Sequence, residues 1–200
     1  MTKLTAPAAE RNKEPILAVL QEYLPKTGTV LEVASGTGQH AAYFAPRLAP
    51  LKWLPSEADK AQLASIKAWR ADLACESLLA PIELDVLTTP VPLESIPVSA
   101  IVNINMLHIA PWACCSALFA RAATLLPSEG TVVLYGPFRR GGQHTAPTNA
   151  QFDAQLRARD PAWGVRDFEA VSETAEQHNF GCTAVIDMPA NNLSLVFSKR

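Results

Sequence analysis

The chain has 200 residues, of which 48% are hydrophobic and 18% charged, and its formal net charge is −2. A chain of this length suits one domain that buries roughly 70% of its unfolded surface, and the near-neutral charge excludes a general attraction for nucleic acid. Neither a signal peptide nor a run of about 18 apolar residues is recognisable. We therefore expect one domain over residues 1–200, located in the cytoplasm and not bound to a membrane.

Apolar periodicity, β-branched residues and prolines predict alternating helices and strands over the first two thirds of the chain. In chain order they are a helix from Pro15 to near Pro25, a strand over Thr29–Ala34, a helix over Ala41–Leu48 that Pro46 shortens, a strand over Leu51–Leu54, a helix from Asp59 to about Leu73, a strand over Ile82–Val86, a connection broken by Pro90, Pro92 and Pro97, a strand over Ala100–Asn105, a helix from Trp112 to Leu126 and a strand over Thr131–Tyr135.

The last third of the chain departs from this alternation. A loop over Gly136–Asn149 is followed by two helical segments around Asp160–Gly164, and then by strands over Cys182–Met188 and Leu193–Ser198 that form a hairpin. Strands that alternate with helices build a parallel sheet, to which the hairpin adds an antiparallel pair. The predicted fold is therefore α/β, a doubly wound Rossmann-like mixed sheet of seven strands, mostly parallel, with a C-terminal antiparallel hairpin.

A glycine turn follows the first strand and predicts a ligand site. Gly36 and Gly38 permit a tight turn at the carboxyl end of that strand, where parallel sheets bind ligands. Glu32, inside the strand, is a costly buried carboxylate unless a ligand's hydroxyls or ammonium, or another group, hydrogen-bonds it. With Ala41 the turn also fits the dinucleotide pattern GxGxxG/A, so a nicotinamide or flavin enzyme has to be considered.

Two further acidic residues follow the next strands. Glu57 lies 19 positions after Gly38, about the spacing at which one βαβ unit returns a strand beside the first, so its carboxylate could accept both hydroxyls of a ribose. Alternatively, Glu57 is exposed to solvent beside the N-terminal cap of the next helix. Asp59 is the better candidate for the cap itself. Asp85 lies at the end of the third strand, where it could bind a ligand or cap its own turn.

Two motifs carry a resemblance to known enzymes. Glu32-x-Ala34-x-Gly36-x-Gly38 resembles the first motif of class I S-adenosylmethionine-dependent methyltransferases, Asp/Glu-x-Gly-x-Gly-x-Gly, with Ala34 in place of its first glycine. Asn105-Met106-Leu107-His108 resembles the Asn-x-Leu-His run of many small-molecule methyltransferases. Almost the whole chain is similar to an uncharacterised methyltransferase-like protein family found from bacteria to animals, through the runs Ala9–Ile16, Leu31–His40, Trp53–Glu57 and Asp160–Asp167.

The resemblance implies S-adenosylmethionine as the cofactor. In this resemblance Asp85 offers its carboxylate to the adenine amino group of the cofactor. The residues that it assigns to the cofactor are Glu32, Ala34, Gly36, Gly38, Glu57, Asp85, Asn105 and Met106. His108 borders the substrate as the candidate catalytic base, and its alternative role is a hydrogen-bonded histidine in the seam between helix and sheet.

The acceptor site is expected at the fifth strand. Tyr135, Phe138 and Arg139 follow or end this strand and are predicted to line the substrate pocket. Arg11 and Asn12 precede the first predicted helix, and residues 1–14 are predicted to form an N-terminal arm or lid. Such an arm could bind a carboxylate of the cofactor or of the substrate, or it could be only a solvated charged run.

We therefore predict a methyltransferase that uses S-adenosylmethionine and acts on a small-molecule acceptor. A non-catalytic binding or scaffold protein remains possible, and an NAD(P)-dependent oxidoreductase is disfavoured because the sequence contains no Tyr-x-x-x-Lys pair. No metal-ligand cluster is recognisable, and the four cysteines contain no Cys-x-x-Cys pair, so neither a metal site nor a disulfide framework is expected.

Overall fold

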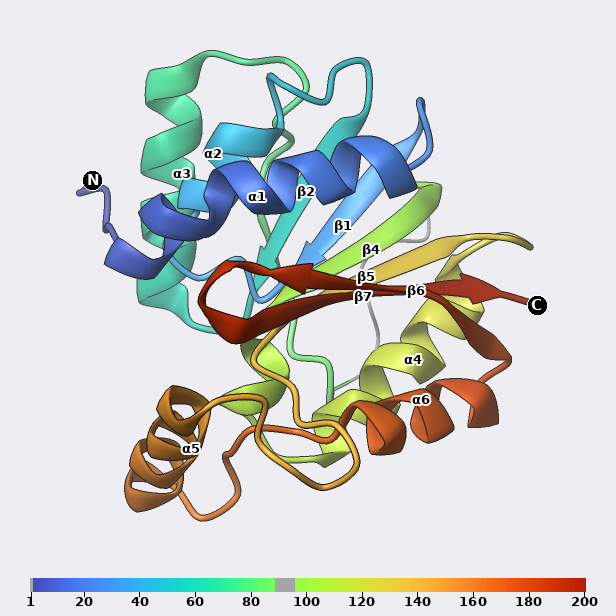
Figure 1. Cartoon of the computed structure of the whole chain (residues 1–200). Coiled ribbons are helices and arrows are strands. Elements are labelled where there is room, and N and C mark those ends of the chain that lie inside the picture. The colour runs from blue at the N-terminus through green and yellow to red at the C-terminus, as the bar shows by residue number, and fades with distance from the viewer. Residues whose placement is uncertain (1, 89–95) are drawn as a thin grey trace.

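Seven strands form one mixed sheet in the order β3-β2-β1-β4-β5-β7-β6 in the computed structural model, which describes residues 2–88 and 96–200 (Figure 1). The elements are α1 (Pro7–Tyr23), β1 (Thr29–Val33), α2 (Gln39–Phe44), β2 (Lys52–Glu57), α3 (Lys60–Leu73), β3 (Ile82–Glu83), β4 (Val98–Ile104), α4 (Ala113–Leu125), β5 (Thr131–Gly136), α5 (Pro147–Arg159), α6 (Phe168–Gln177), β6 (Phe180–Met188) and β7 (Asn192–Lys199).

The strand directions confirm the predicted fold class. The strands from β3 to β5 pair in parallel, whereas β7 pairs antiparallel with both β5 and β6. β1 lies between β2 and β4, and the chain leaves β1 first toward one edge of the sheet and later toward the other. At such a reversal the loops after two neighbouring strands diverge and leave a crevice at their carboxyl ends.

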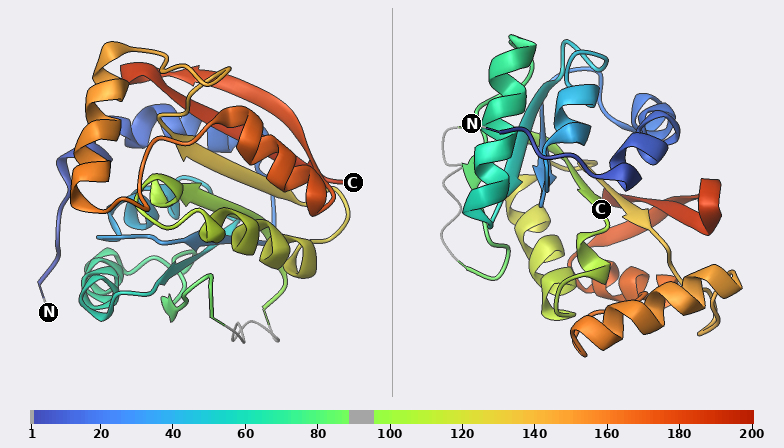
Figure 2. Two further views of the ribbon diagram at one scale, coloured as in Figure 1. Left: turned by 90° about the horizontal axis from the view of Figure 1, so that it is seen from below. Right: turned by 90° about the vertical axis from the view of Figure 1, so that its left-hand side faces the viewer.

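Two layers of helices cover the sheet (Figure 2). Side chains of β1 alternate between the layers, so that Val30 packs with Ile16 of α1 and Phe44 of α2, whereas Leu31 packs with Leu118 of α4 and others on the opposite face. This period of two is what a strand buried on both faces requires. No helix within residues 2–88 and 96–200 is both long and apolar enough to cross a bilayer.

The prediction for the start of the first helix was wrong. α1 begins at Pro7, and Pro15 lies inside it rather than at its first position. Pro7 occupies an early position where no N–H is needed, and good helix formers such as Ala8, Ala9 and Glu10 extend the helix up to Pro15. Residues 7–14 of the predicted arm are therefore helical, whereas residues 2–6 have no regular secondary structure.

The third strand is shorter than predicted. β3 ends at Glu83 because Asp85 starts a turn, in which its Oδ1 accepts the N–H of Leu87 at 2.9 Å. The prolines Pro90 and Pro92 of the predicted connection lie outside the described residues. The other helices and strands agree with the predicted ones within about two residues at most ends, and Asp59 caps α3 as expected by accepting the N–H of Ala61 at 2.7 Å.

Candidate functional site

A hollow of about 450 Å³ opens where β1 and β4 end, at the reversal of strand order. We call it the strand-end hollow. Its lining includes seven of the residues predicted from the sequence to bind a cofactor, namely Asn12, Glu32, Ala34, Gly36, Glu57, Asn105 and Met106. Because Asn12 belongs to α1, the first helix closes one side of this hollow.

The turn after β1 depends on three residues in the left-handed region, Ala34 at φ 57°, Gly36 at φ 55° and Gly38 at φ 86°. The conformation of Ala34 costs about 1 kcal/mol relative to glycine, which gives a physical reason for the glycine at this position in the general motif. A Cβ on Gly36 would meet no atom within 4 Å, because this residue faces the hollow.

Gly38 has a different role from Gly36. A Cβ on Gly38 would lie 2.9 Å from the Cα atom of Ile66 in α3, closer than real Cβ contacts allow. Gly38 does not line the hollow, and its missing side chain lets α3 approach the turn. The sequence motif therefore combines one glycine that leaves space for a ligand with one that permits helix packing.

Glu57 fastens the glycine turn to the end of β2. Its Oε2 accepts the N–H of Gly36 at 2.8 Å, and its Oε1 accepts the N–H groups of Ala58 at 2.8 Å and Asp59 at 3.2 Å. A carboxylate has about four lone-pair positions, so these three bonds leave capacity for a hydroxyl group in the hollow. Glu57 is thus both part of the lining and a support of the turn.

Glu32 has a protein partner that sequence reasoning missed. The carboxyl group is 1% exposed, and its Oε2 accepts the indole N–H of Trp53 at 3.0 Å. Burial raises the pKa of Glu32 to about 7, although hydrogen bonds from Trp53 and Ser35 oppose this shift. The group therefore changes its charge near neutral pH, inside a hollow that could hold a hydroxyl-bearing or cationic ligand.

A second hollow of about 430 Å³ lies on the other side of Asn105, and we call it the hairpin hollow because Pro189 and Asn192 of the C-terminal hairpin help to line it. It shares Ala8, Asn12 and Asn105 with the strand-end hollow. The two hollows therefore adjoin. Asn105, in the left-handed conformation at φ 66°, stands at their junction and donates its N–H to the carbonyl of Tyr135 at 2.9 Å.

Tyr135 and Asn12 hold the walls of the hairpin hollow. The Tyr135 hydroxyl accepts the side-chain N–H of Asn192 at 2.8 Å, and burial raises the pKa of Tyr135. The Asn12 side-chain oxygen lies 2.7 Å from Nε2 of His40, whose pKa burial lowers to about 4. His40 is therefore neutral and donates this bond, a contact that nothing in the local sequence indicated.

His108 lies beneath the junction and lines neither hollow. It is 1% exposed, its Nδ1 accepts the N–H of Arg166 at 3.4 Å, and its ring packs edge-on against Phe138 at 4.8 Å between centroids. Burial, followed by the charge of Arg166, lowers its pKa to about 3. This environment matches the alternative interpretation of a histidine in the seam between helix and sheet.

The run Asp160–Asp167 fixes the turn that contains His108. Arg166 donates from Nε to the carbonyl of Leu107 at 2.9 Å and from Nη2 to the carbonyl of Ala110 at 2.7 Å. Gly164 adds an N–H bond to the carbonyl of His108 at 2.9 Å. The segment between α5 and α6 therefore supports the turn that contains His108, although it lines neither hollow.

Three residues predicted for the site, all within the described part of the chain, also lie outside both hollows. Asp85 is exposed and caps its own turn, Phe138 is buried against His108, and Arg139 forms an ion pair with Asp167 at 3.0 Å. The structure thus brings Tyr135, Arg11 and Asn12 to the hairpin hollow, whereas Phe138 and Arg139 do not line it. Among the described residues, no group of three His, Cys, Asp or Glu side chains could hold a metal ion.

The residues before α1 lie along α3. The N–H of Leu4 is donated to Ser65 Oγ at 2.8 Å, the indole N–H of Trp69 is donated to the Leu4 carbonyl at 3.0 Å, and Ala6 donates its N–H to the side chain of Gln39. Because Ala6 also lines the strand-end hollow, this segment borders that hollow.

Comparison with known proteins agrees with this architecture. The model of a protein family of unknown function (DUF938) matches residues 3–199. Among solved structures, an O-methyltransferase family protein from Burkholderia thailandensis is similar with a TM-score of 0.78 at 15% identity, over 96% of this chain and 57% of that one. Human N-acetylserotonin methyltransferase in complex with SAM reaches 0.78 at 11% identity, over 96% and 52% of the two chains.

A third similar structure is an O-methyltransferase family 2 protein from Planctomyces limnophilus in complex with apigenin, with a TM-score of 0.75 at 16% identity over 94% of this chain and 62% of that one. The chain thus spans between half and two thirds of the length of these three structures. At such identities the likeness shows that the chain shares the fold of these methyltransferases.

Proposed function

The chain belongs to the DUF938 family of unknown function, and we propose that it is an S-adenosylmethionine-dependent methyltransferase that acts on a small-molecule acceptor. One observation carries this proposal. Two hollows adjoin at the carboxyl ends of the central strands and share Ala8, Asn12 and Asn105. Group transfer between two bound molecules needs such a pair of sites with a common boundary, because the reacting atoms must be held about 3–3.5 Å apart.

The strand-end hollow fits the cofactor. Its volume of about 450 Å³ lies in the range of ligand pockets, roughly 300–1,000 Å³. The remaining acceptor capacity of Glu57 suits ribose hydroxyls, the open space at Gly36 admits a ligand close to the backbone, and Glu32 suits a positively charged group. When bound there, S-adenosylmethionine supplies a methyl group made electrophilic by its sulfonium.

The hairpin hollow is proposed to hold the acceptor. Asn105 lies at the boundary, and Tyr135 and Asn12 provide hydrogen-bonding groups in walls that are fixed by Asn192 and His40. These residues can orient the acceptor and exclude water. Their contribution to the rate of methyl transfer is therefore to position the acceptor. His108, with a pKa near 3 and buried outside both hollows, is proposed to position the Asn105 turn rather than to accept a proton.

A non-catalytic protein that binds the cofactor is the second candidate. It is favoured by the lining of the hairpin hollow, which includes no Asp, Glu, His or Lys side chain among the described residues. A nucleophile that carries a proton would then have to lose it to water, because the raised pKa of Tyr135 keeps its hydroxyl protonated. An acceptor that ionises by itself near neutral pH avoids this difficulty.

Calorimetry and a transfer assay test the proposal together. The protein should bind S-adenosylhomocysteine and not NAD, and it should transfer labelled methyl groups from S-adenosylmethionine into the small-molecule fraction of a metabolite extract. Gly36→Val, which fills the open space in the hollow, should abolish both results. Binding without transfer would favour the non-catalytic candidate, whereas NAD binding without a response to S-adenosylhomocysteine would refute the proposal.

A further inference from the structure

The charged groups that line the hairpin hollow are of one sign, positive. Arg11 is the single charged residue among the described residues that line it, and the other polar groups there are amides and the Tyr135 hydroxyl. Arg11 is exposed and forms no ion pair or side-chain hydrogen bond with another described residue, whereas Arg139, Arg140 and Arg157 each pair with a carboxylate. Its guanidinium is therefore free to bind an anion in the hollow.

The two adjoining hollows differ in sign. Glu32, Glu57 and Asp59 line the strand-end hollow and make it acidic, whereas Arg11 lines only the hairpin hollow. A cationic sulfonium is attracted to the first, and an anionic molecule is attracted to the second. Because Arg11 lies outside the strand-end hollow, its position favours an anion of the acceptor over the carboxylate of the cofactor.

Pro15, one helical turn after Arg11, adds a second polar feature. Proline has no N–H, so the carbonyl oxygen of Arg11 lacks the bond that a residue four positions later normally donates. Both residues line the hairpin hollow. Arg11 therefore brings to this wall a guanidinium donor and a carbonyl oxygen that receives no bond from residue 15.

Another part of the lining is apolar. Phe152 of α5 is 39% exposed although it is a large aromatic residue, and it lines the hollow together with Pro137 and Pro189. The flat ring of Phe152 can pack against a planar hydrocarbon body. The hollow thus combines one cation, several amides and an apolar wall within about 430 Å³.

We infer, on the basis of the proposed function, that the methyl acceptor is a small carboxylic acid with a planar apolar body, whose carboxylate binds Arg11. A carboxylate is preferred to a doubly charged phosphate because the hollow supplies one cation. The guanidinium fork matches a carboxylate in bidentate geometry, and the planar body would then extend along Phe152 toward Asn105.

A library of matched compounds tests this inference with protein saturated by S-adenosylhomocysteine. Each planar aromatic acid is included with its primary amide and its corresponding amine, and binding is measured by ligand-detected NMR and titration. Acids should bind in preference to their amides. Arg11→Gln should weaken acid binding about tenfold, which corresponds to about 1.4 kcal/mol, and should leave amide binding unchanged. Arg11→Glu should shift the preference from acids to amines.

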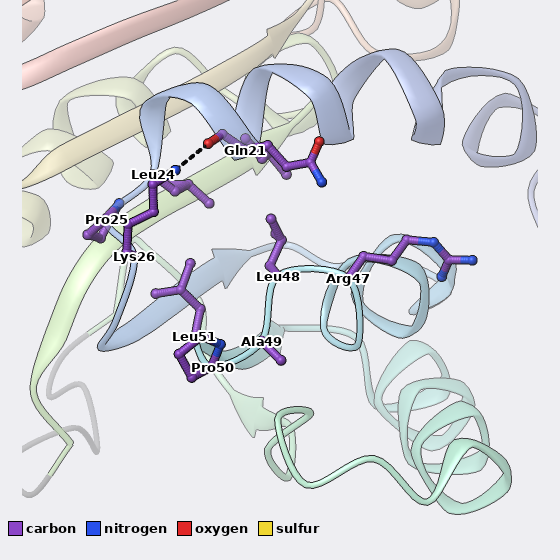
Figure 3. Close-up of a pocket in the computed structure, with 10 residues that line it drawn as sticks. Gln21, Leu24, Pro25, Lys26, Arg47, Leu48, Ala49, Pro50 and Leu51 are labelled. Carbon is purple, nitrogen blue, oxygen red and sulfur yellow. Dashed lines mark hydrogen bonds between the residues drawn. The ribbon is translucent and has the colours of Figure 1, made fainter.

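Arg47→Gln is the matched control. Arg47 is also exposed, and it lines a separate hollow of about 350 Å³ between the end of α1 and residues 48–51, near the start of β2 (Figure 3). This substitution removes the same charge and should leave acid binding unchanged. An acid preference that survives in Arg11→Gln, or a library in which no acid binds, refutes the inference.

Cofactor binding distinguishes a failure of the proposed function from a failure of the inferred acceptor class. Arg11→Gln should retain the affinity for S-adenosylhomocysteine within about twofold, since Arg11 lies outside the strand-end hollow. If the unchanged protein does not bind S-adenosylhomocysteine, the proposed function fails. If it binds S-adenosylhomocysteine but shows no preference for acids, only the acceptor class is wrong.

Discussion

Replacing Glu57 with glutamine tests the link between the glycine turn and ligand binding. The two carboxylate oxygens of Glu57 accept N–H groups on both sides, from Gly36 at 2.8 Å on one oxygen and from Ala58 at 2.8 Å and Asp59 at 3.2 Å on the other. Glutamine keeps the size of the side chain but has one oxygen, and its NH₂ group cannot accept. Either the bond to Gly36 or the bonds to Ala58 and Asp59 must therefore break.

The expected loss follows from the charge on the acceptor. A hydrogen bond to a charged group contributes about 1.5–3 kcal/mol, and the substitution removes at least one such bond as well as the charge offered to the ligand. We expect the affinity for S-adenosylhomocysteine to fall about 10- to 100-fold. A loss of about 1–2 kcal/mol from the ligand-free protein should lower the Tm by about 2–8 °C for a chain of this size.

Calorimetry with S-adenosylhomocysteine and thermal unfolding without it measure the two effects separately. Glu83→Gln is the control, because Glu83 is exposed on β3 and pairs in register with Glu57. It should change neither quantity appreciably. If Glu57→Gln lowers the Tm but binds S-adenosylhomocysteine within twofold of the unchanged chain, then Glu57 only supports the turn, and the reasoning that places it against the ligand is refuted.

Three further predictions concern buried groups of the site. Burial raises the pKa of Glu32 from 4.5 to about 7, so between these values the folded state binds more protons than the unfolded one and stability falls as pH rises. Glu32→Gln should abolish this slope in urea unfolding and stabilise the protein at pH 8 by up to about 2–3 kcal/mol, whereas an unchanged slope would contradict the raised pKa. The pKa of His108 is lowered to about 3, so its contribution to stability is present above pH 6.5 and is lost as pH falls toward 3. His108→Asn should lower the Tm at pH 7 and reduce its loss in acid, and a methyl-transfer rate that titrates near pH 6.5 only when His108 is present would instead identify a catalytic base. In Gly38→Ala the new Cβ would lie 2.9 Å from the Cα of Ile66, so this variant should lose about 2 kcal/mol or more of unfolding free energy in the same assay. Gly36→Ala should lose only about 1 kcal/mol, because its Cβ meets no atom. Equal losses would contradict the different roles of the two glycines.

Much of the fold could be predicted because its signals are local. The near-continuous apolar run of Val30, Leu31 and Val33 indicates a strand buried on both faces, and Asp59 marks the start of α3 by its capping side chain. The start of α1 differs from the prediction because Pro15 lies inside the helix and does not begin it. Proline only disfavours a helix at its own turn, and the packing of Ala9, Ile16 and Leu20 outweighs that cost.

The structure brings several of the predicted site residues together because of their position along the sheet. Glu32, Gly36 and Glu57 lie at adjacent strand ends, so strand order alone brings them to one hollow. The hydrogen bond from Trp53 to Glu32 could not be predicted from the sequence. Trp53 pairs in register with Val30, two residues before Glu32, so the bond depends on the rotamers of Trp53 and Glu32. Asp85 lies outside the hollow because β3 ends at Glu83, three residues before the predicted end at Val86, and Asp85 starts a turn.

α1 has consequences for both hollows at once. Ala8 and Asn12 of this helix line both of them, and His40 at the start of α2 holds Asn12 at 2.7 Å. α1 therefore cannot move away from the strand-end hollow without also opening the hairpin hollow. Since the residues before α1 are bound to α3 through Leu4, a ligand that orders the strand-end hollow also stabilises the wall on which Arg11 stands. Binding in the two hollows should consequently be coupled, with the affinity for an acid increased by S-adenosylhomocysteine and the reverse by the same factor.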